Sequence, residues 1–323
     1  MRAVVVETSG PPEVMRVAEV PTPRAGPGEV LIRVVASGVN RADLLQRQGR
    51  YPPPRGASEI LGLEVSGTIA AVGDGVHDWR VGEECVALLA GGGYAEYVVV
   101  PAGQVVRPPR GIDLVTASGL IEVAATVASN LTQVGLRPGE TFLVHGGTGG
   151  IGTFAIQYAS ALGARVFATA GRPHKLALCR ELGATDAFDY HDDWLAALRR
   201  ATDRHGADVI LDVIGAKYLP SNLDALASDG RLVVIGLQGG RTGTLDLGKL
   251  LAKRASVTAT GLRGRPAEQK AAICAEVERT VWPLIEAGRI RPAVETRYHA
   301  EDATEAHRHL ASGEAVGKLI LTW

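Results

Sequence analysis

Short apolar runs, each bounded by turn residues, mark the first third of the chain. They are rich in β-branched residues and lie at Ala3–Val6, Glu29–Ala36, Gly67–Val72, Glu84–Leu89 and Ala95–Val100. Glycine and proline clusters such as Gly10-Pro11-Pro12 separate them. Several short strands at this spacing are typical of a compact all-β unit. We therefore expect a β-rich domain at this end of the chain.

The pattern changes near Asp113, where an apolar stretch with helical spacing covers Thr116–Gln133. Beyond it, segments with strand and helix character alternate. The predicted strands are Thr141–His145, Arg165–Ala170, Ala187–Tyr190, Asp208–Val213, Arg231–Gly236 and Ser256–Gly261. The predicted helices between them include Gly152–Leu162, Lys175–Leu182 and Trp194–Thr202. Such alternation indicates a parallel sheet with right-handed crossovers, an α/β fold.

The end of the chain carries one more long helical stretch and a strand. The helix is predicted at Ala267–Ala287, and Lys318–Trp323 has strand character. We expect this closing segment to fold back onto the N-terminal unit.

Composition narrows the class of protein. The chain has 323 residues, is 46% hydrophobic and has a formal net charge of -1, so it can bury a sizeable core and shows no bias toward a nucleic-acid or anionic membrane partner. Its three cysteines, Cys85, Cys179 and Cys274, form no CxxC pair. No apolar stretch is long enough to cross a membrane, and within Met1–Glu7 a charge arrives before any signal-peptide core could form. We expect a cytoplasmic protein.

A glycine-rich turn follows the predicted strand Thr141–His145 and opens an apolar helix. Such a turn lets backbone N–H groups approach a pyrophosphate at a helix N-terminus. The alternative is a plain glycine-rich turn, but the strand and the helix that the motif requires are both present. The residues expected to bind a dinucleotide here are Gly147, Thr148, Gly149, Gly150, Ile151 and Gly152.

The end of the next strand indicates which dinucleotide. NAD enzymes usually carry an acidic residue there, for the ribose 2′-hydroxyl. This chain has instead Gly171, Arg172 and Lys175, with no acid between them. Arginine and lysine suit a 2′-phosphate, so the pattern favours NADP over a merely solvated basic helix start.

The arrangement resembles the medium-chain dehydrogenase/reductase superfamily. That resemblance implies a GroES-like β-rich catalytic domain at residues 1–120, a Rossmann doubly wound parallel sheet that binds NADP at 121–264, and a return segment at 265–323 that completes the catalytic domain. Zinc members place a cysteine and a histidine where this chain has Asn40 and Leu63. Leucine cannot bind zinc and neutral asparagine is a poor ligand, so we expect no metal.

Further motifs are similar to the zinc-free quinone oxidoreductases of this superfamily: Gly38–Pro52, Gly56–Gly67, Ala87–Gly93, Ile210–Gly215, Asp229–Leu237 and Gly317–Lys318. The resemblance implies catalytic roles for Asn40, Tyr51 and Thr148. It also implies that the cofactor contacts Asn40, Thr126, Thr148, Arg172, Lys175, Tyr190, Gly215, Gly236, Leu237, Leu262, Arg263 and Lys318. Asp43 and Glu64 are expected to be structural, His145 packed or bonded to backbone, and Cys85 in the core.

Without a Lewis acid, the expected acceptors are electron-poor, such as quinones or conjugated enones. The resemblance implies hydride transfer from the nicotinamide C4 of NADPH to a quinone, in the cleft between the two domains. The alternatives are an NADPH-dependent enoyl or enone reductase and a non-enzymatic NADPH-binding structural or RNA-binding protein. The resemblance also implies a homodimer in which Ser256–Gly261 pairs with its copy.

Overall fold

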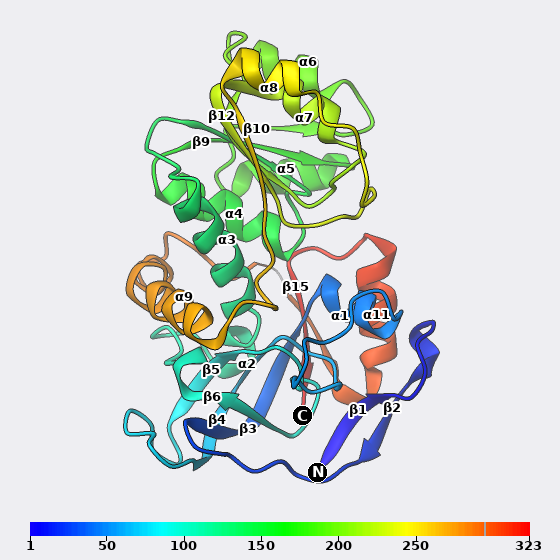
Figure 1. The fold of residues 1–323 in the computed structure, drawn as a ribbon, viewed down its shortest axis with the longest axis vertical. Coiled ribbons are helices and arrows are strands. Elements are labelled where there is room, and N and C mark those ends of the chain that lie inside the picture. Colours follow the sequence, from blue (N-terminus) through cyan, green and yellow to red (C-terminus); the bar gives the residue numbers. More distant parts are fainter. Residues whose placement is uncertain (294) are drawn as a thin grey trace. The chain divides into compact units, whose positions relative to one another are not determined.

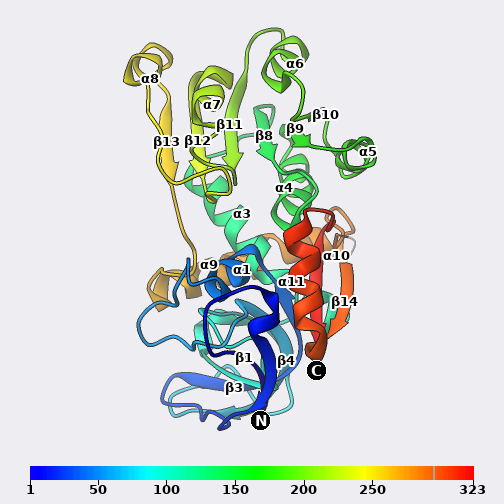
Figure 2. The ribbon, with the colours of Figure 1, turned by 90° about the vertical axis from the view of Figure 1, so that its right-hand side faces the viewer.

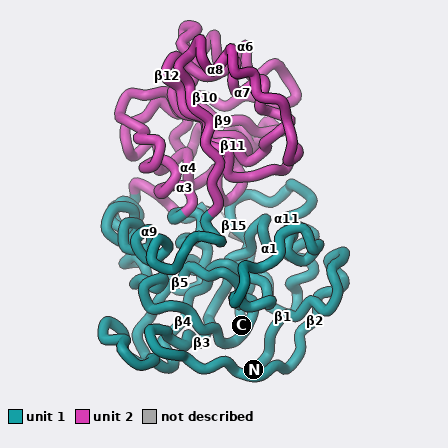
Figure 3. The backbone as a smooth tube through the Cα atoms, viewed as in Figure 1, with its two compact units in different colours: residues 1–125, 262–288, 292–323 teal, residues 126–261, 289–291 magenta. Residues whose placement is uncertain are grey.

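The computed structural model describes residues 1–293 and 295–323, which form two compact units. Unit 1 comprises Met1–Ala125, Leu262–Gly288 and Pro292–Trp323, and unit 2 comprises Thr126–Gly261 and Arg289–Arg291 (Figure 3).

Unit 2 is built on a six-stranded parallel sheet. Its strands are β8 (Thr141–His145), β9 (Arg165–Ala170), β10 (Asp186–Asp189), β11 (Ala207–Asp212), β12 (Leu226–Val234) and β13 (Ser256–Ala259). Their order is β10-β9-β8-β11-β12-β13, which Figure 2 shows across the sheet. The order reverses between β8 and β11, so the carboxyl ends of these two strands form the switch point at which such sheets bind ligands. The predicted Rossmann sheet is confirmed.

The strands of unit 2 are apolar because helices connect them and cover the sheet. All five residues of β8 are buried. The helices are α3 (Ile121–Gln133), which begins in unit 1, α4 (Gly150–Ala161), α5 (Pro173–Glu181), α6 (Trp194–Ala201), α7 (Leu219–Ala225) and α8 (Leu247–Lys253). Leu143, Phe167 and Ile210 lie at the centre of the core beneath α6 and α7.

Unit 1 is β-rich, as predicted. A hairpin joins β1 (Arg2–Val6) to β2 (Met15–Glu19). A second sheet contains β3 (Glu29–Val39), β4 (Glu64–Val72), β5 (Glu84–Leu88), β6 (Tyr97–Pro101), β7 (Val105–Val106), β14 (Glu295–His299) and β15 (Lys318–Thr322). Strand β15 pairs antiparallel with β3, with Leu319 opposite Val39 (Figure 1). This pairing places Lys318 beside the end of β3.

The helices of unit 1 are α1 (Arg41–Arg47), α2 (Leu114–Ala117), α9 (Ala267–Thr280), α10 (Trp282–Glu286) and α11 (Ala303–Ser312). Short 3-10 turns lie at Pro12–Val14, Ala102–Gln104 and Ala300–Asp302. The sequence pattern missed the helices α1, α7, α8 and α11 and the strands β2, β7 and β14.

Two predicted helices are each divided in the structure. The stretch Thr116–Gln133 is α2 and α3, because the N–H of Glu122 donates to the Glu64 carboxylate at 3.0 Å instead of continuing a helix from α2. The stretch Ala267–Ala287 is α9 and α10, and the break lies just before Pro283, which lacks an N–H. Among the described residues, none of these helices is both long and apolar enough to cross a membrane.

Candidate cofactor site and active site

The glycine turn of unit 2 is shaped by backbone contacts that exclude side chains. A Cβ on Gly152 would lie 2.2 Å from the Gly146 carbonyl oxygen, so only glycine lets α4 pack against the turn. A Cβ on Gly149 would meet nothing closer than that same oxygen at 3.8 Å. Gly149 is the N-cap of α4 and supplies no side-chain cap. Gly149 therefore leaves room beside the N-terminus of α4, where a helix can bind a pyrophosphate.

The end of β9 carries the other predicted nucleotide contacts. A Cβ on Gly171 would lie 2.4 Å from the Tyr190 hydroxyl, so this tyrosine packs directly on the glycine backbone. Tyr190 itself is 46% exposed, so part of it faces solvent. Arg172 is exposed at the N-cap of α5, whereas Lys175 is buried one turn later. Arg172 is therefore the more accessible of the two predicted phosphate ligands.

The structure places the remaining predicted cofactor residues in both units. Unit 2 holds Thr126, which is buried, and the loop residues Gly215, Gly236 and Leu237, of which Leu237 is 52% exposed. Thr148 and Ile151 lie in the turn and the first turn of α4, with Thr148 buried. Unit 1 holds Asn40, Tyr51, Leu262, Arg263 and Lys318.

A buried relay links the glycine turn to the loop after β11. His145 Nε2 donates to the side-chain oxygen of Asn222 at 2.8 Å, and Asn222 donates to Asp212 at 3.1 Å. Asp212 also accepts the N–H groups of Ile214 and Gly215, at 2.6 and 3.0 Å. Burial raises the pKa of Asp212 to about 6 and lowers that of His145 to about 4. The relay therefore fixes both loops of the switch point around a neutral imidazole.

The prediction that His145 is packed is confirmed, but its partners are side chains, not backbone groups. Its other ring nitrogen, Nδ1, lies 3.0 Å from the Thr169 hydroxyl. The side chains of Trp194 and Tyr218 pack edge-on against the ring, with centroids 5.0 and 4.8 Å away.

Asn40 lies in unit 1 in a closed ring of three buried polar side chains. Its Nδ2 donates to Glu64 Oε1 at 3.0 Å, and its Oδ1 accepts from Lys318 Nζ at 2.6 Å. Lys318 also forms an ion pair with Glu64 Oε1. The second carboxylate oxygen of Glu64 accepts the N–H of Glu122 at 3.0 Å. At the start of α1 the Asp43 carboxylate accepts the Asn40 N–H at 2.7 Å, while both polar atoms of the Asn40 side chain bond within this ring.

A second buried network of unit 1 fixes the backbone around Asn40. Asp43 accepts the N–H groups of Asn40 at 2.7 Å and Gly62 at 3.2 Å. Tyr94 donates to Asp43 at 3.1 Å and accepts from His307 Nε2 at 3.2 Å. Arg47 lies 3.3 Å from the other nitrogen of His307. Burial raises the pKa of Asp43 to about 6 and lowers that of His307 to about 3. As predicted, Asp43 has a structural role.

Tyr51 lies beneath the guanidinium of Arg263, which is 5.3 Å from the ring centre. Arg263 donates to Ala90 O at 2.7 Å, to Gln46 at 2.7 Å and to Tyr51 O at 3.3 Å, so it ties three segments of unit 1 together. Burial raises the pKa of the Tyr51 phenol, which keeps its hydroxyl protonated as a hydrogen-bond donor. Within residues 1–293 and 295–323 that hydroxyl has no hydrogen-bond partner.

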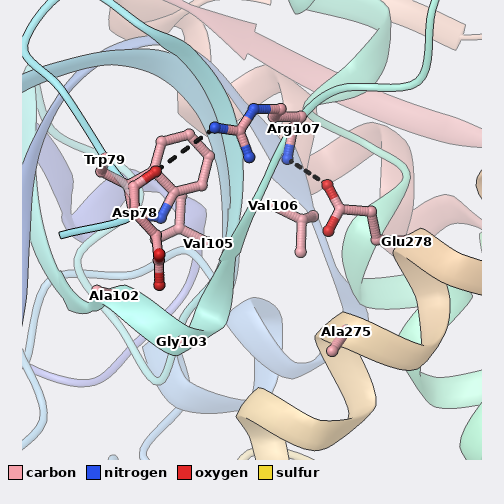
Figure 4. Close-up of a pocket in the computed structure, with 9 residues that line it drawn as sticks. All are labelled: Asp78, Trp79, Ala102, Gly103, Val105, Val106, Arg107, Ala275 and Glu278. Atoms are coloured by element: carbon pink, nitrogen blue, oxygen red, sulfur yellow. Dashed lines mark hydrogen bonds between the residues drawn. The ribbon is translucent and has the colours of Figure 1, made fainter. Parts of the chain in front are cut away.

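A pocket of about 390 Å³ lies elsewhere in unit 1 and contains none of the predicted site residues. Figure 4 shows Arg107 at its edge, where its backbone N–H donates to Glu278 at 3.2 Å and its guanidinium donates to Asp78 O at 3.4 Å. The guanidinium lies 4.9 Å from the ring centre of Trp79. The pocket is thus bordered by surface residues that are joined by hydrogen bonds and a cation–π contact.

Sequence reasoning missed most of the residues that hydrogen-bond to the predicted site residues. It regarded Glu64 as structural but did not place it against Asn40 and Lys318, and it did not single out Tyr94, His307, Asn222 or Asp212. For Asp212 a signal existed, because a carboxylate directly after a buried strand must find donors. For Lys318, which is separated from Asn40 by 278 positions, the sequence holds no local signal.

The chain is similar in sequence and in fold to several known proteins. A profile of zinc-binding dehydrogenases matches residues 150–276, and a profile of the alcohol dehydrogenase GroES-like domain matches residues 26–110. A quinone oxidoreductase of Pseudomonas aeruginosa is 34% identical over 97% of this chain and 96% of its own length. The phthioceranic/hydroxyphthioceranic acid synthase of Mycobacterium tuberculosis is 33% identical over 98% of this chain, which spans 15% of that synthase. The crystal structure of the Escherichia coli quinone oxidoreductase complexed with NADPH matches all of both chains, with 27% identity and a TM-score of 0.89.

The zinc in the name of the first profile does not fit this chain. Asn40 and Leu63 replace two ligands, and the Lys318 ammonium bonds the Asn40 oxygen that would have to face a cation. No group of three His, Cys, Asp or Glu side chains in the described part of the chain could hold a metal ion. The chain therefore belongs to the zinc-free quinone oxidoreductase subfamily of the medium-chain dehydrogenase/reductase superfamily.

Proposed function

We propose that the protein is an NADPH-dependent quinone reductase that works without a metal ion. Two observations carry the proposal: unit 2 has a glycine turn with room for a dinucleotide, and unit 1 has the Asn40 amide and Leu63 at the positions where zinc dehydrogenases carry metal ligands. The relative from P. aeruginosa is a quinone oxidoreductase, and the E. coli one was solved with NADPH. Quinones suit such a site because they accept a hydride without Lewis-acid help.

Unit 2 would hold the cofactor. The residues present fit it: Gly149 leaves room at the α4 N-terminus, Tyr190 presents a partly exposed ring over Gly171, and the exposed Arg172 offers a planar fork to a 2′-phosphate. Gly215, Gly236 and Leu237 would border the rest of the nucleotide. When bound, NADPH supplies a hydride from its nicotinamide C4.

Unit 1 would supply the groups that contact the acceptor. The Asn40 amide has two N–H donors, and one of them is committed to Glu64. The other has only a long contact, 3.5 Å, to Gly38 O. The Tyr51 hydroxyl is a protonated donor. These two donors of unit 1 would bond the acceptor oxygens as negative charge develops on them.

The direct test is NADPH consumption by the chelator-treated protein with a panel of ortho- and para-quinones. We expect turnover with NADPH that exceeds turnover with NADH. Tyr51→Phe removes only the hydroxyl and should lower kcat about 10-fold with an unchanged thermal midpoint. No quinone-dependent loss of NADPH across the panel would overturn the proposal.

A second function has one observation in its favour, the match to part of an acid synthase. It is NADPH-dependent reduction of an enoyl thioester or a 2-alkenal, which needs the same cofactor and oxyanion donors. Parallel panels of 2-enoyl thioesters, alkenals and quinones separate the two functions. A kcat/KM at least 10-fold higher for an enoyl thioester than for every quinone would favour this alternative.

We also propose a homodimer that forms through the free edge of the unit 2 sheet. Strand β13 is the last strand of that sheet. On the adjoining helix α8, Leu247 and Leu251 are 69% and 83% exposed, an apolar surface that a second copy would cover. Light scattering after size exclusion should give twice the chain mass, and Leu251→Glu should give a monomer. A wild-type monomer would refute the dimer.

A further inference from the structure

The ring of Asn40, Glu64 and Lys318 is an unusual structure to bury. Glu64 is fully buried, and Asn40 and Lys318 are 9% and 7% exposed. A buried ion pair must overcome a desolvation penalty of several kcal/mol per ion, so such a pair often adds nothing to stability. Stability alone therefore does not explain why the chain retains this buried ion pair.

The chain around the ring makes room for it. A Cβ on Gly38 would lie 2.2 Å from Glu64 Oε1, so glycine is required two residues before Asn40. A Cβ on Gly119 would lie 3.3 Å from the stem of Lys318. The backbone of two separate segments thus leaves space for one carboxylate and one ammonium next to a single amide.

The ring has a specific effect on the Asn40 amide, because it fixes the positions of the amide oxygen and the amide nitrogen. A cation contacts Oδ1 and an anion contacts Nδ2, so the reversed amide would place two acceptors or two donors against each other. One N–H is used on Glu64. The second N–H, with its long contact to Gly38 O, is the donor that remains for a ligand.

The ring also polarises the amide. A positive charge on the carbonyl oxygen draws electron density from the nitrogen, which strengthens its N–H donors, and chains of hydrogen bonds at low dielectric reinforce one another. A charge-assisted contact of this kind is roughly twice as strong as a neutral one.

We propose that Lys318 and Glu64 lock and polarise the Asn40 amide as an oxyanion donor, so that an ammonium acts through an amide at the position where zinc dehydrogenases carry a metal. This inference rests on the proposed function and deepens it. Lys318 and Glu64 are positioning residues, and Asn40 is the group that would contact the acceptor. No covalent or proton-transfer step is assigned to the ring.

The test variant is Lys318→Met with Glu64→Gln. It removes both charges together, since Lys318→Met alone would leave an unpaired buried carboxylate and could fail to fold. The glutamine oxygen still accepts the Asn40 N–H. We expect kcat to fall about 10- to 100-fold, a larger factor than any rise in the NADPH dissociation constant that follows from the loss of Lys318 as a predicted cofactor contact. The control is Lys249→Met with Asp224→Asn, which removes a partly exposed ion pair of unit 2 and should leave kcat unchanged.

Two further readouts separate polarisation from a structural role. The loss should be greatest for the least electron-poor quinones, so the dependence of log kcat on quinone reduction potential steepens. When Asn40→Leu is added, the triple variant should be no slower than Asn40→Leu alone, because the charges act through that amide. Additive losses, a uniform loss across the quinones, or a loss confined to NADPH affinity would overturn the inference.

A binding experiment keeps the inference testable if the protein turns over no quinone, a result that would reject the proposed function alone. The probe is 4-nitrophenolate, an oxyanion, titrated by calorimetry into the protein loaded with NADP⁺. The wild type should bind it at least about 10-fold more tightly than the doubly neutral variant. Equal affinities would overturn the inference.

Discussion

Each unit of the molecule contains one buried relay that runs from a histidine to an aspartate. In unit 1 it is His307–Tyr94–Asp43, and in unit 2 it is His145–Asn222–Asp212. In both, histidine Nε2 donates to the bridging side chain, which donates to the carboxylate. Each carboxylate also accepts two backbone N–H groups: Asp43 those of Asn40 and Gly62, and Asp212 those of Ile214 and Gly215. The same arrangement thus fixes the backbone around Asn40 in unit 1 and the loop after β11 in unit 2, the two places where we propose that acceptor and nucleotide bind.

The relays differ at their far ends. His307 contacts the buried guanidinium of Arg47, whose Nε has no hydrogen-bond partner among the described residues, whereas His145 contacts the hydroxyl of Thr169. Unit 1 also holds the charged pair Lys318–Glu64 beside its relay. The proposed acceptor site of unit 1 therefore lies beside buried charged side chains. The proposed nucleotide site of unit 2 consists instead of backbone N–H groups and an exposed arginine. The difference suits an oxyanion in the first case and a phosphate at the surface in the second.

Removing the carboxylates should have the largest effects and compares the relays directly. Asp43→Ala leaves two buried N–H groups and the Tyr94 hydroxyl without an acceptor, and should lower the free energy of unfolding by about 4 kcal/mol. Asp212→Ala should cost about 3 kcal/mol, since Ile214 is half-buried and water can replace part of the loss. Urea unfolding followed by circular dichroism measures both. The asparagine variants, which keep one acceptor, are the controls, and losses below 1 kcal/mol would show that the relays do not hold these loops.

Two glycines of the nucleotide turn separate packing from ligand approach. Gly152→Ala forces a Cβ against the Gly146 carbonyl and should lower the free energy of unfolding by about 3 kcal/mol, with loss of NADPH binding. Gly149→Ala has room for its Cβ, so stability should be unchanged. Its methyl group would meet an incoming pyrophosphate and weaken NADPH binding about 10-fold, as measured by fluorescence titration. If Gly149→Ala binds NADPH like the wild type, the pyrophosphate does not lie there.

The pH dependence of stability tests the buried histidines and aspartates together. Asp43 and Asp212, with pKa values raised to about 6, bind more protons in the folded state between pH 4 and 6, so their contribution to stability falls as pH rises. His145 and His307, with pKa values lowered to about 4 and about 3, bind fewer protons when folded, so their contribution rises over the same range. The two trends oppose each other.

Removing a histidine or an aspartate should reveal the pH dependence of stability that the remaining groups contribute. From pH 4.5 to 6, His307→Gln should lose about 2 kcal/mol of unfolding free energy relative to the wild type over the same interval. Asp43→Asn should gain about 1 kcal/mol over that interval, since the falling contribution is gone. Urea midpoints at the two pH values measure this. Profiles of both variants that run parallel to the wild type would contradict the account.

The smallest expected effect concerns the exposed end of the nucleotide site. Arg172→Ala should raise KM for NADPH about 10-fold and leave KM for NADH unchanged, because only the 2′-phosphate loses a contact. Stability should not change, since Arg172 is exposed. Arg180→Ala, on the same helix, is the control. Equal changes for both cofactors would place the 2′-phosphate elsewhere.

Sequence reasoning succeeded where local pattern carries the information. The strands and the glycine turn of unit 2 follow from apolar runs and a contiguous motif, so they could be placed in advance. The short helix α1 was missed, since it spans only Arg41–Arg47 and its first turn is fixed by Asp43. The ring at Asn40 could not be assembled from the sequence, because its lysine arrives through the pairing of β15 with β3. Long-range pairing decides such contacts.

The most direct test of the central claim is steady-state NADPH oxidation by the chelator-treated wild type, assayed side by side with quinones and 2-enoyl thioesters. The account predicts metal-independent turnover that is fastest with a quinone. Turnover that requires added zinc, or that occurs only with enoyl thioesters, would contradict it.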